Sequence, residues 1–258
     1  MTDLETVWLP LRAHTQADAL PMFCLPHAGG SASAYRGWMG KLPGVAVLPV
    51  QPPGREARLR DAPHNHMGPL VEELATVVLG VAGTRPYAVY GHSLGGLVGF
   101  ELLRAIRRRG GAMPAHFFVS GCVAPHTAFD DGPPVAGMSL PQLVEMLRQL
   151  GGTPEWLLND PSVLDMIVPA VRADFSIKET YEYVSEAPLQ VPITVLSSTH
   201  DPRASHELQA GWRDQTIGAC QVHTLVGGHF AVFEQPELTQ KYVNAALVPI
   251  LYGSPFRN

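Results

Sequence analysis

The sequence predicts an α/β fold with a mostly parallel central sheet, helices on both of its faces and a helical insertion. Three observations predict it. Short apolar runs alternate with segments of helical spacing from about residue 22 to residue 120, and the alternation resumes near residue 187. Strands that are apolar throughout are typical of parallel sheets covered on both faces. Between these two parts, residues 125–186 have helical patterns and no strand-like run.

The core elements are bounded by turn-forming residues. The predicted strands are residues 22–25, 44–50, 87–90, 116–120, 192–197 and 220–226, and the predicted helices are residues 70–81, 97–109 and 238–252. Residues 6–11 are expected to form an edge strand, because Pro10 lacks the N–H that a central strand must donate.

Residues 125–186 are predicted to interrupt a core made of residues 1–124 and 187–258. Ser139 should cap a helix with Pro141 in its first turn, and glycines at 151 and 152 should end it. Asp160 should cap a longer helix that reaches about Tyr183, and Pro169 should kink or restart it. An insertion at this place commonly covers the active site, so we expect it to act as a lid.

The composition limits the classes of function. The chain has 258 residues, of which 46% are hydrophobic and 16% charged, and its formal net charge is -5. No basic run is longer than residues 107–109, which argues against nucleic acid as a partner. Three scattered cysteines, Cys24, Cys122 and Cys220, are predicted to be buried free thiols, as expected for a cytoplasmic protein. The N-terminus does not resemble a signal peptide, and no apolar run could span a membrane.

The stretch Gly91-His92-Ser93-Leu94-Gly95 lies between a predicted strand and a predicted helix. In that context G-x-S-x-G indicates a nucleophile elbow, a sharp turn that exposes the serine hydroxyl at a helix N-terminus. The two glycines remove Cβ atoms that would collide across the turn. We therefore predict Ser93 as the nucleophile and the backbone N–H of Leu94 as one donor to an oxyanion.

A second glycine-containing loop follows the strand at residues 22–25. It reads His27-Ala28-Gly29-Gly30 and is similar to the loop that provides the other oxyanion donor in lipases and esterases. Ala28 is the predicted donor through its backbone N–H. Taken alone, this loop would be interpreted as an ordinary glycine turn.

Asp201 and His229 follow the last two predicted strands, and the order Ser, Asp, His along the chain is that of α/β-hydrolases. His229 is the predicted general base and Asp201 the residue that orients it. Asp130 and Asp131 are rival acids after the strand at 116–120. No cofactor is predicted, and His64 and His66, which could suggest a metal site, have no further ligand nearby in the sequence.

Six motifs are spread over residues 20–245: Pro26-His27-Ala28-Gly29-Gly30-Ser31-Ala32, Pro53-Gly54-Arg55-Glu56, Gly91-His92-Ser93-Leu94-Gly95-Gly96, Arg172-Ala173-Asp174-Phe175, Glu179-Thr180-Tyr181 and Gly227-Gly228-His229-Phe230. Together they resemble the type II thioesterases, the free-standing editing enzymes of polyketide and nonribosomal peptide assembly lines. The resemblance implies the α/β-hydrolase fold, the triad Ser93, Asp201 and His229, and hydrolysis of acyl groups from the phosphopantetheine arm of acyl or peptidyl carrier proteins. These partners would bind transiently, and we expect a monomer.

Two departures from the family pattern stand out. Pro52 precedes Pro-Gly-Arg where the family commonly has an aromatic or aliphatic residue, and the loop before Asp201 is not glycine-rich. Two other functions remain open at this point. One is a lipase or carboxylesterase for small oxygen esters, and the other is a non-catalytic binding protein on a hydrolase scaffold.

Overall fold

A six-stranded parallel sheet forms the centre of the molecule. The computed structural model describes residues 3–12, 18–127 and 132–253. The sheet order is β2-β1-β3-β4-β5-β6, and every neighbouring pair is parallel. The strands are β1 (Leu20–Leu25), β2 (Val45–Pro49), β3 (Ala88–His92), β4 (His116–Ser120), β5 (Ile193–Ser198) and β6 (Cys220–Leu225). The predicted parallel sheet is confirmed, with strand ends within about two residues of those expected.

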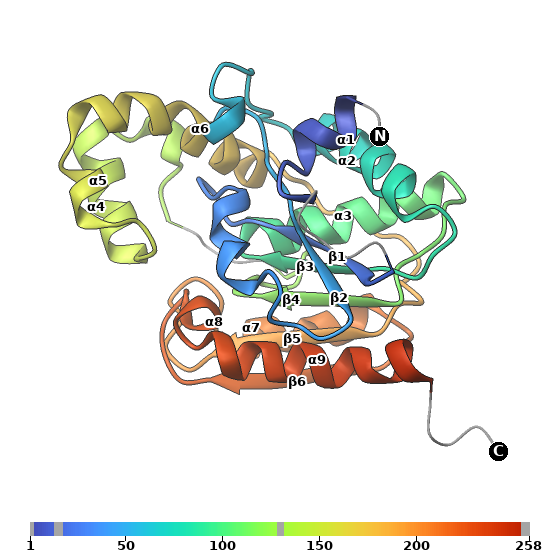
Figure 1. The fold of residues 1–258 in the computed structure, drawn as a ribbon. Coiled ribbons are helices and arrows are strands. Elements are labelled where there is room, and N and C mark those ends of the chain that lie inside the picture. Colours follow the sequence, from blue (N-terminus) through green and yellow to red (C-terminus); the bar gives the residue numbers. More distant parts are fainter. Residues whose placement is uncertain (1–2, 13–17, 128–131, 254–258) are drawn as a thin grey trace.

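Helices cover both faces of this sheet (Figure 1). In the view of Figure 1, α2 and α3 lie above the sheet, and α9 lies at the bottom of the view in front of β5 and β6. The α-helices are α1 (Asp3–Trp8), α2 (Met67–Ala82), α3 (Leu94–Arg108), α4 (Leu140–Leu150), α5 (Glu155–Leu158), α6 (Pro161–Glu179), α7 (His206–Ala210), α8 (Ala231–Glu234) and α9 (Pro236–Tyr252). The 3-10 helices are η2 (Ala32–Trp38), η3 (Glu56–Arg58), η4 (Val135–Gly137) and η5 (Gly211–Gln215).

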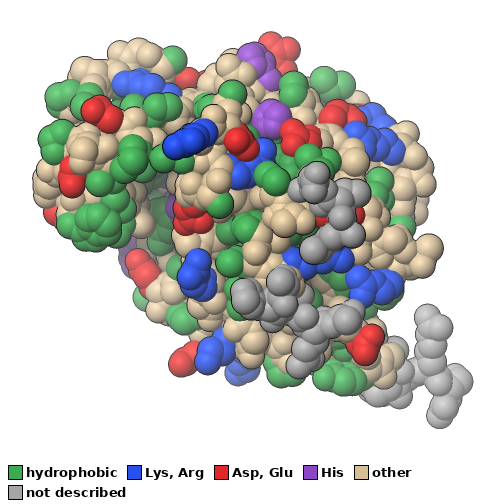
Figure 2. Space-filling view, turned by 45° about the horizontal axis from the view of Figure 1, so that its top comes forward, with side chains coloured by type: hydrophobic (Ala, Val, Ile, Leu, Met, Phe, Trp, Pro, Cys, Tyr) green, Lys and Arg blue, Asp and Glu red, His purple; other side chains and the backbone are tan. Residues whose placement is uncertain are grey.

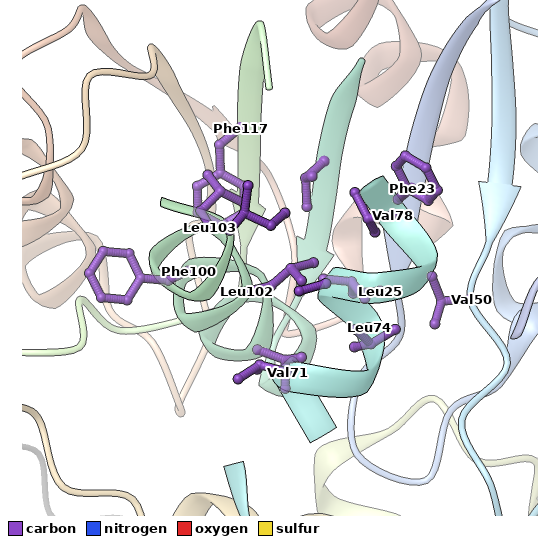
Figure 3. Packing of buried hydrophobic residues seen from close by; sticks show 14 of the residues in the cluster. Phe23, Leu25, Val50, Val71, Leu74, Val78, Phe100, Leu102, Leu103 and Phe117 are labelled. Atoms are coloured by element: carbon purple, nitrogen blue, oxygen red, sulfur yellow. The ribbon is translucent and has the colours of Figure 1, made fainter. Parts of the chain in front are cut away.

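Alternate residues of each strand enter different cores. Phe23 and Phe117 pack under α2 and α3, whereas Met22 and Phe118 pack under η2 and α9. Figure 3 shows side chains of α2 and α3, such as Leu74 and Leu102, packed between the two helices and the strands. Strands β1 to β5 are buried along their whole length, and the apolar runs within them could be recognised in the sequence. The edge strand β6 is only partly buried and contains the polar residues Gln221, His223 and Thr224.

The residues between β4 and β5 form a separate lobe of helices, α4 to α6, beside the sheet (Figure 1). This lobe has its own small core, which includes Leu143, Leu147, Leu158 and Phe175. Figure 2 shows hydrophobic side chains on the outside of this lobe and a hollow in the surface between it and the rest of the molecule. The expected helical segment is therefore present; its function as a lid stays a prediction.

The predicted caps of these helices are found. Ser139 and Gln142 form a capping box at the start of α4, and Gly151 ends that helix. Asp160 accepts hydrogen bonds from two backbone N–H groups of α6. Pro169 lies inside α6 and does not restart it, and the helix ends at Glu179 rather than at Tyr183.

The expected edge strand at residues 6–11 is wrong, because Asp3–Trp8 form helix α1. The side chain of Trp8 is fully buried in the core under α2, and its Nε1 donates to Glu73 Oε1 at 2.6 Å. The helix ends before Pro10, where a proline commonly follows a helix. The buried tryptophan therefore holds this segment as a helix against the core.

The expectation of three buried free thiols is confirmed only in part. All three cysteines are free thiols, but only Cys24 and Cys122 are buried, and Cys220 is half-exposed. Arg107 and Arg108 at the end of α3 both pair with Glu186, so this basic run forms ion pairs within the chain. None of the helices in the described ranges is long and apolar enough to cross a membrane.

His116 is a buried histidine at the start of β4. Its Nε2 lies 2.8 Å from Thr194 Oγ1, and its ring stacks on Phe118. Burial lowers the pKa of His116 from its usual 6.5 to about 4. Between these two values the unfolded chain binds a proton that the folded protein does not bind, so stability falls as the pH falls.

We expect His116→Gln to reduce this pH dependence, because glutamine can also bond to Thr194 and does not titrate. One histidine shifted in this way costs about 2 kcal/mol of unfolding free energy at about pH 5 and almost nothing at about pH 7.5. Urea unfolding at both pH values should show wild type losing about 2 kcal/mol more than the variant. Equal losses would contradict the assigned pKa shift.

Candidate active site

Ser93 lies on the turn between β3 and α3 with φ 55° and ψ -120°, a left-handed conformation that is strained for a non-glycine residue. Its backbone N–H donates to Ser120 O at 2.8 Å. A Cβ at Gly91 would lie 2.2 Å from Gly95 O, and a Cβ at Gly95 would lie 2.2 Å from Leu25 O. Both glycines are therefore required sterically, as the motif predicted.

One predicted oxyanion donor, Leu94, belongs to the elbow, and the other, Ala28, belongs to the loop after β1. Leu94 is the first residue of α3, where backbone N–H groups have no acceptor within the helix. Ala28 follows β1 in a turn closed by a bond from Gly30 N to His27 O. Both residues line the same cavity as Ser93. The N–H after Ala28, that of Gly29, donates to Asp174 Oδ2 at 2.7 Å.

Asp201 and His229 form a buried pair beyond the ends of β5 and β6. His229 Nδ1 lies 2.9 Å from Asp201 Oδ2, and both residues are less than 8% exposed. The other carboxylate oxygen accepts from the backbone N–H groups of Arg203 and Ala204 at 2.9 and 3.2 Å. The carboxylate is thus held by its own loop and directs one oxygen at the imidazole.

Ser93 and His229 line one cavity of about 260 Å³. Its lining from the sheet core includes Ala28, Leu94, Leu97, Cys122 and Phe230, and its lining from the helical lobe includes Leu147, Leu150, Gly151, Asp174 and Phe175. Among the described residues, Ser93 Oγ makes no hydrogen bond to His229. Such catalytic contacts commonly tighten only in the complex with substrate.

Two further histidines, which could not be assigned to the site from the sequence, lie near His229: His92 packs against it and His27 packs against His92. The ring of His92 lies 5.0 Å from that of His229, and its Nδ1 lies 2.9 Å from Ser120 Oγ. The ring of His27 packs edge-on against His92 and Phe230. Burial lowers the pKa of His27 to about 4 and holds the pKa of His92 well below its usual value. Both rings are therefore neutral at neutral pH.

Four other histidines that could compete with His229 or hold a metal ion have contacts of their own. His200 bonds to the neighbouring Thr199 and is exposed, and His223 stacks on Tyr242 away from the cavity. His64 Nε2 lies 3.1 Å from Glu73 Oε2, and His66 Nδ1 lies within hydrogen-bond distance of Asn65 Oδ1. The described ranges contain no group of three His, Cys, Asp or Glu side chains placed to hold a metal ion. Asp130 and Asp131 lie outside the described residues.

Comparisons with known proteins agree with this geometry. The thioesterase domain family matches residues 20–246. RedJ, a thioesterase of the prodiginine pathway in Streptomyces coelicolor, is 36% identical with a TM-score of 0.83, covering 89% of this chain and 91% of RedJ. BorB, a type II thioesterase from the borrelidin biosynthetic cluster, is 33% identical with a TM-score of 0.82, covering 90% and 94% of the two chains.

One similar protein is named as a dehydrogenase and not as a thioesterase. A protein of Brevibacillus parabrevis called linear gramicidin dehydrogenase is 35% identical over 95% of this chain and 94% of its own length. The loop after β1 in the present chain has the order His27-Ala28-Gly29-Gly30, which is not the G-x-G-x-x-G of dinucleotide sites. The expected resemblance to type II thioesterases is thus confirmed, and the chain belongs to the thioesterase family, whose members hydrolyse thioesters.

Proposed function

We propose that this thioesterase removes acyl groups from the phosphopantetheine arm of acyl or peptidyl carrier proteins, through an acyl-enzyme on Ser93. The observation that carries the proposal is the shared cavity, in which Ser93, His229 and both oxyanion donors meet. BorB is a type II thioesterase from a biosynthetic cluster, and RedJ belongs to the prodiginine biosynthetic pathway. Editing of misprimed or stalled assembly lines is the function that best fits this similarity.

Acylation begins when Ser93 Oγ attacks the thioester carbonyl. His229 accepts the hydroxyl proton, and the C–S bond breaks as the tetrahedral intermediate collapses. The leaving group is the thiol of the arm, which receives the proton from His229. Thiolate leaves readily because the pKa of a thiol is only about 8.5, so little leaving-group protonation is needed.

Deacylation repeats the same steps with water. His229 takes a proton from the water molecule, hydroxide attacks the ester carbonyl, and the proton returns to Ser93 Oγ as the acid is released. Asp201 accepts the Nδ1–H of His229, which leaves Nε2 free to exchange protons. No group outside the protein and water is required, so we expect no cofactor and no metal.

The negative charge of each intermediate would be stabilised by the N–H groups of Ala28 and Leu94. The dipole of α3 adds to this effect because the site lies at its N-terminus. His27 and His92 are neutral, so they do not oppose the positive charge that forms on His229. The imidazolium is therefore stabilised by Asp201 without competition from a second cation on these rings.

The helical lobe is well placed to act as the lid. Leu147, Leu150 and Phe175 give the cavity an apolar wall, which suits an acyl chain. We expect the lobe to move when a carrier protein binds. We also expect this binding to be transient and the enzyme to be a monomer. The free buried thiols Cys24 and Cys122 are in keeping with work in the cytoplasm.

Ser93→Ala should abolish turnover, because it removes the nucleophile. We expect a loss of about 10⁶-fold, as is found when a serine nucleophile is removed. The measurement is the intact mass of an acylated carrier protein over time, with wild type and variant. Loss of the acyl mass with wild type alone supports the proposal. An unchanged carrier with a small oxygen ester cleaved in parallel would favour the carboxylesterase, and no turnover of either would favour a binding protein.

Asp201→Asn should leave the fold intact and lower kcat by about 10⁴-fold, because an amide can favour the wrong tautomer of the imidazole. The matched control is Asp214→Asn, whose carboxylate is 73% exposed and lies outside the cavity lining. Steady-state kinetics with an acyl thioester should show wild-type kcat for the control. Similar kcat values for both variants would remove Asp201 from the mechanism.

A further inference from the structure

Two sequence motifs have no task in the steps above, yet the fold joins them. Arg55 belongs to the motif Pro53-Gly54-Arg55-Glu56, and Asp174 belongs to α6, 119 residues later. Arg55 Nη1 donates to Asp174 Oδ2 at 2.5 Å, and Nη2 donates to Oδ1 at 2.8 Å. The pair is bidentate and buried, with Arg55 7% and Asp174 5% exposed.

This pair also holds the oxyanion loop. Asp174 Oδ2 accepts the N–H of Gly29 at 2.7 Å, and Arg55 Nη1 donates to the carbonyl of Gly30 at 3.0 Å. Gly29 directly follows Ala28, the proposed oxyanion donor. Fixing the peptide plane on one side of Ala28 limits rotation of its backbone, and so limits the direction of the Ala28 N–H.

Helix α6 packs closely on both loops. A Cβ at Gly29 would lie 2.9 Å from Val171 Cγ2, and a Cβ at Gly54 would lie 3.4 Å from Ala170 Cβ. Ala170, Val171 and Asp174 thus form one contact surface of the helical lobe against the loops of the sheet core. The same helix contributes Phe175 to the wall of the cavity.

We propose that Arg55 and Asp174 are positioning residues, through which helix α6 sets the oxyanion hole. In this arrangement Asp174 fixes the loop and Arg55 neutralises the Asp174 carboxylate, which would otherwise oppose the negative charge that develops nearby. The inference rests on the proposed function, because it assigns the pair a role in the chemistry of Ser93.

The charge of the buried carboxylate predicts an order of kcat values among variants of the pair. Arg55→Met leaves a buried carboxylate unpaired beside the oxyanion loop, so it should lower kcat more than Asp174→Leu or than both changes together. The double variant replaces a buried ion pair by apolar side chains, an exchange that proteins often tolerate in stability. The double variant can therefore test whether the pair positions the oxyanion loop, even if the single variants fold poorly.

The main test is Asp174→Asn, which keeps the size of the side chain and removes its charge. We expect kcat for an acyl thioester to fall by about 10- to 100-fold, because one oxyanion donor is misplaced but still present. KM should change by less than about threefold. In a Ser93→Ala background, Asp174→Asn should leave the binding of the acylated carrier protein unchanged.

An alkyl boronic acid gives a second readout, because its adduct with Ser93 imitates the tetrahedral intermediate. Its affinity should fall in parallel with kcat in Asp174→Asn, since tight binding depends on the oxyanion hole. The matched control is Glu186→Gln, which removes a carboxylate shared by Arg104, Arg107 and Arg108 away from the cavity. It should retain wild-type kcat and boronate affinity.

A lower thermal midpoint with unchanged kcat and boronate affinity, in Asp174→Asn or in the double variant, would overturn the proposal and leave the pair a structural role. The failure of the proposed function has a different signature. In that case wild type would leave the acylated carrier protein unchanged, or Ser93→Ala would remain active, whatever the result for Asp174.

Discussion

The close approach of the elbow to the end of β1 is the constraint on which the site depends. The carbonyl of Leu25 leaves no room for a Cβ at Gly95, so β1, β3 and α3 meet without side chains between them. The oxyanion loop begins immediately after Leu25, and the packing that shapes the elbow therefore also places Ala28 beside Ser93. The left-handed backbone of Ser93 costs about 1–3 kcal/mol, which the surrounding packing must offset. Strain at the nucleophile and the position of the oxyanion donor thus have one origin.

The strand order explains why the remaining groups can reach this point. The chain leaves β1 for β2 on one side and returns to β3 on the other, so the loops after β1 and β3 face each other where the order reverses. Ligand sites in open parallel sheets form at such places. The loops after β5 and β6 are joined by backbone bonds from Thr199 N to Leu225 O and from His200 N to Gly227 O. Asp201 and His229 are therefore presented to the elbow by one connected pair of loops.

Most of the sheet and the site could be predicted because their signals are local. Buried parallel strands are short apolar runs, and the elbow is a five-residue motif whose glycines have a steric reason. Where the local signal misled, a distant contact decided the outcome: α1 forms because Trp8 is buried and bonds to Glu73, 65 residues away. The packing of His92 on His229, and of His27 on His92, could not be predicted for the same reason: in the sequence each histidine is only one residue of a turn. Nothing in the sequence shows that burial makes them neutral.

The ion pair of Arg55 and Asp174 could not be predicted from the sequence. Both residues stood in recognised motifs, but neither motif has a spacing that shows its partner, and the two side chains are 119 residues apart. Removing either partner of a buried ion pair lowers the free energy of unfolding strongly, whereas two apolar side chains of similar size could replace the pair with little loss. Stability alone therefore does not require a buried ion pair at this place. Its two additional bonds, to Gly29 N and Gly30 O, supply the reason, because an apolar pair could not hold the backbone polar groups of the oxyanion loop.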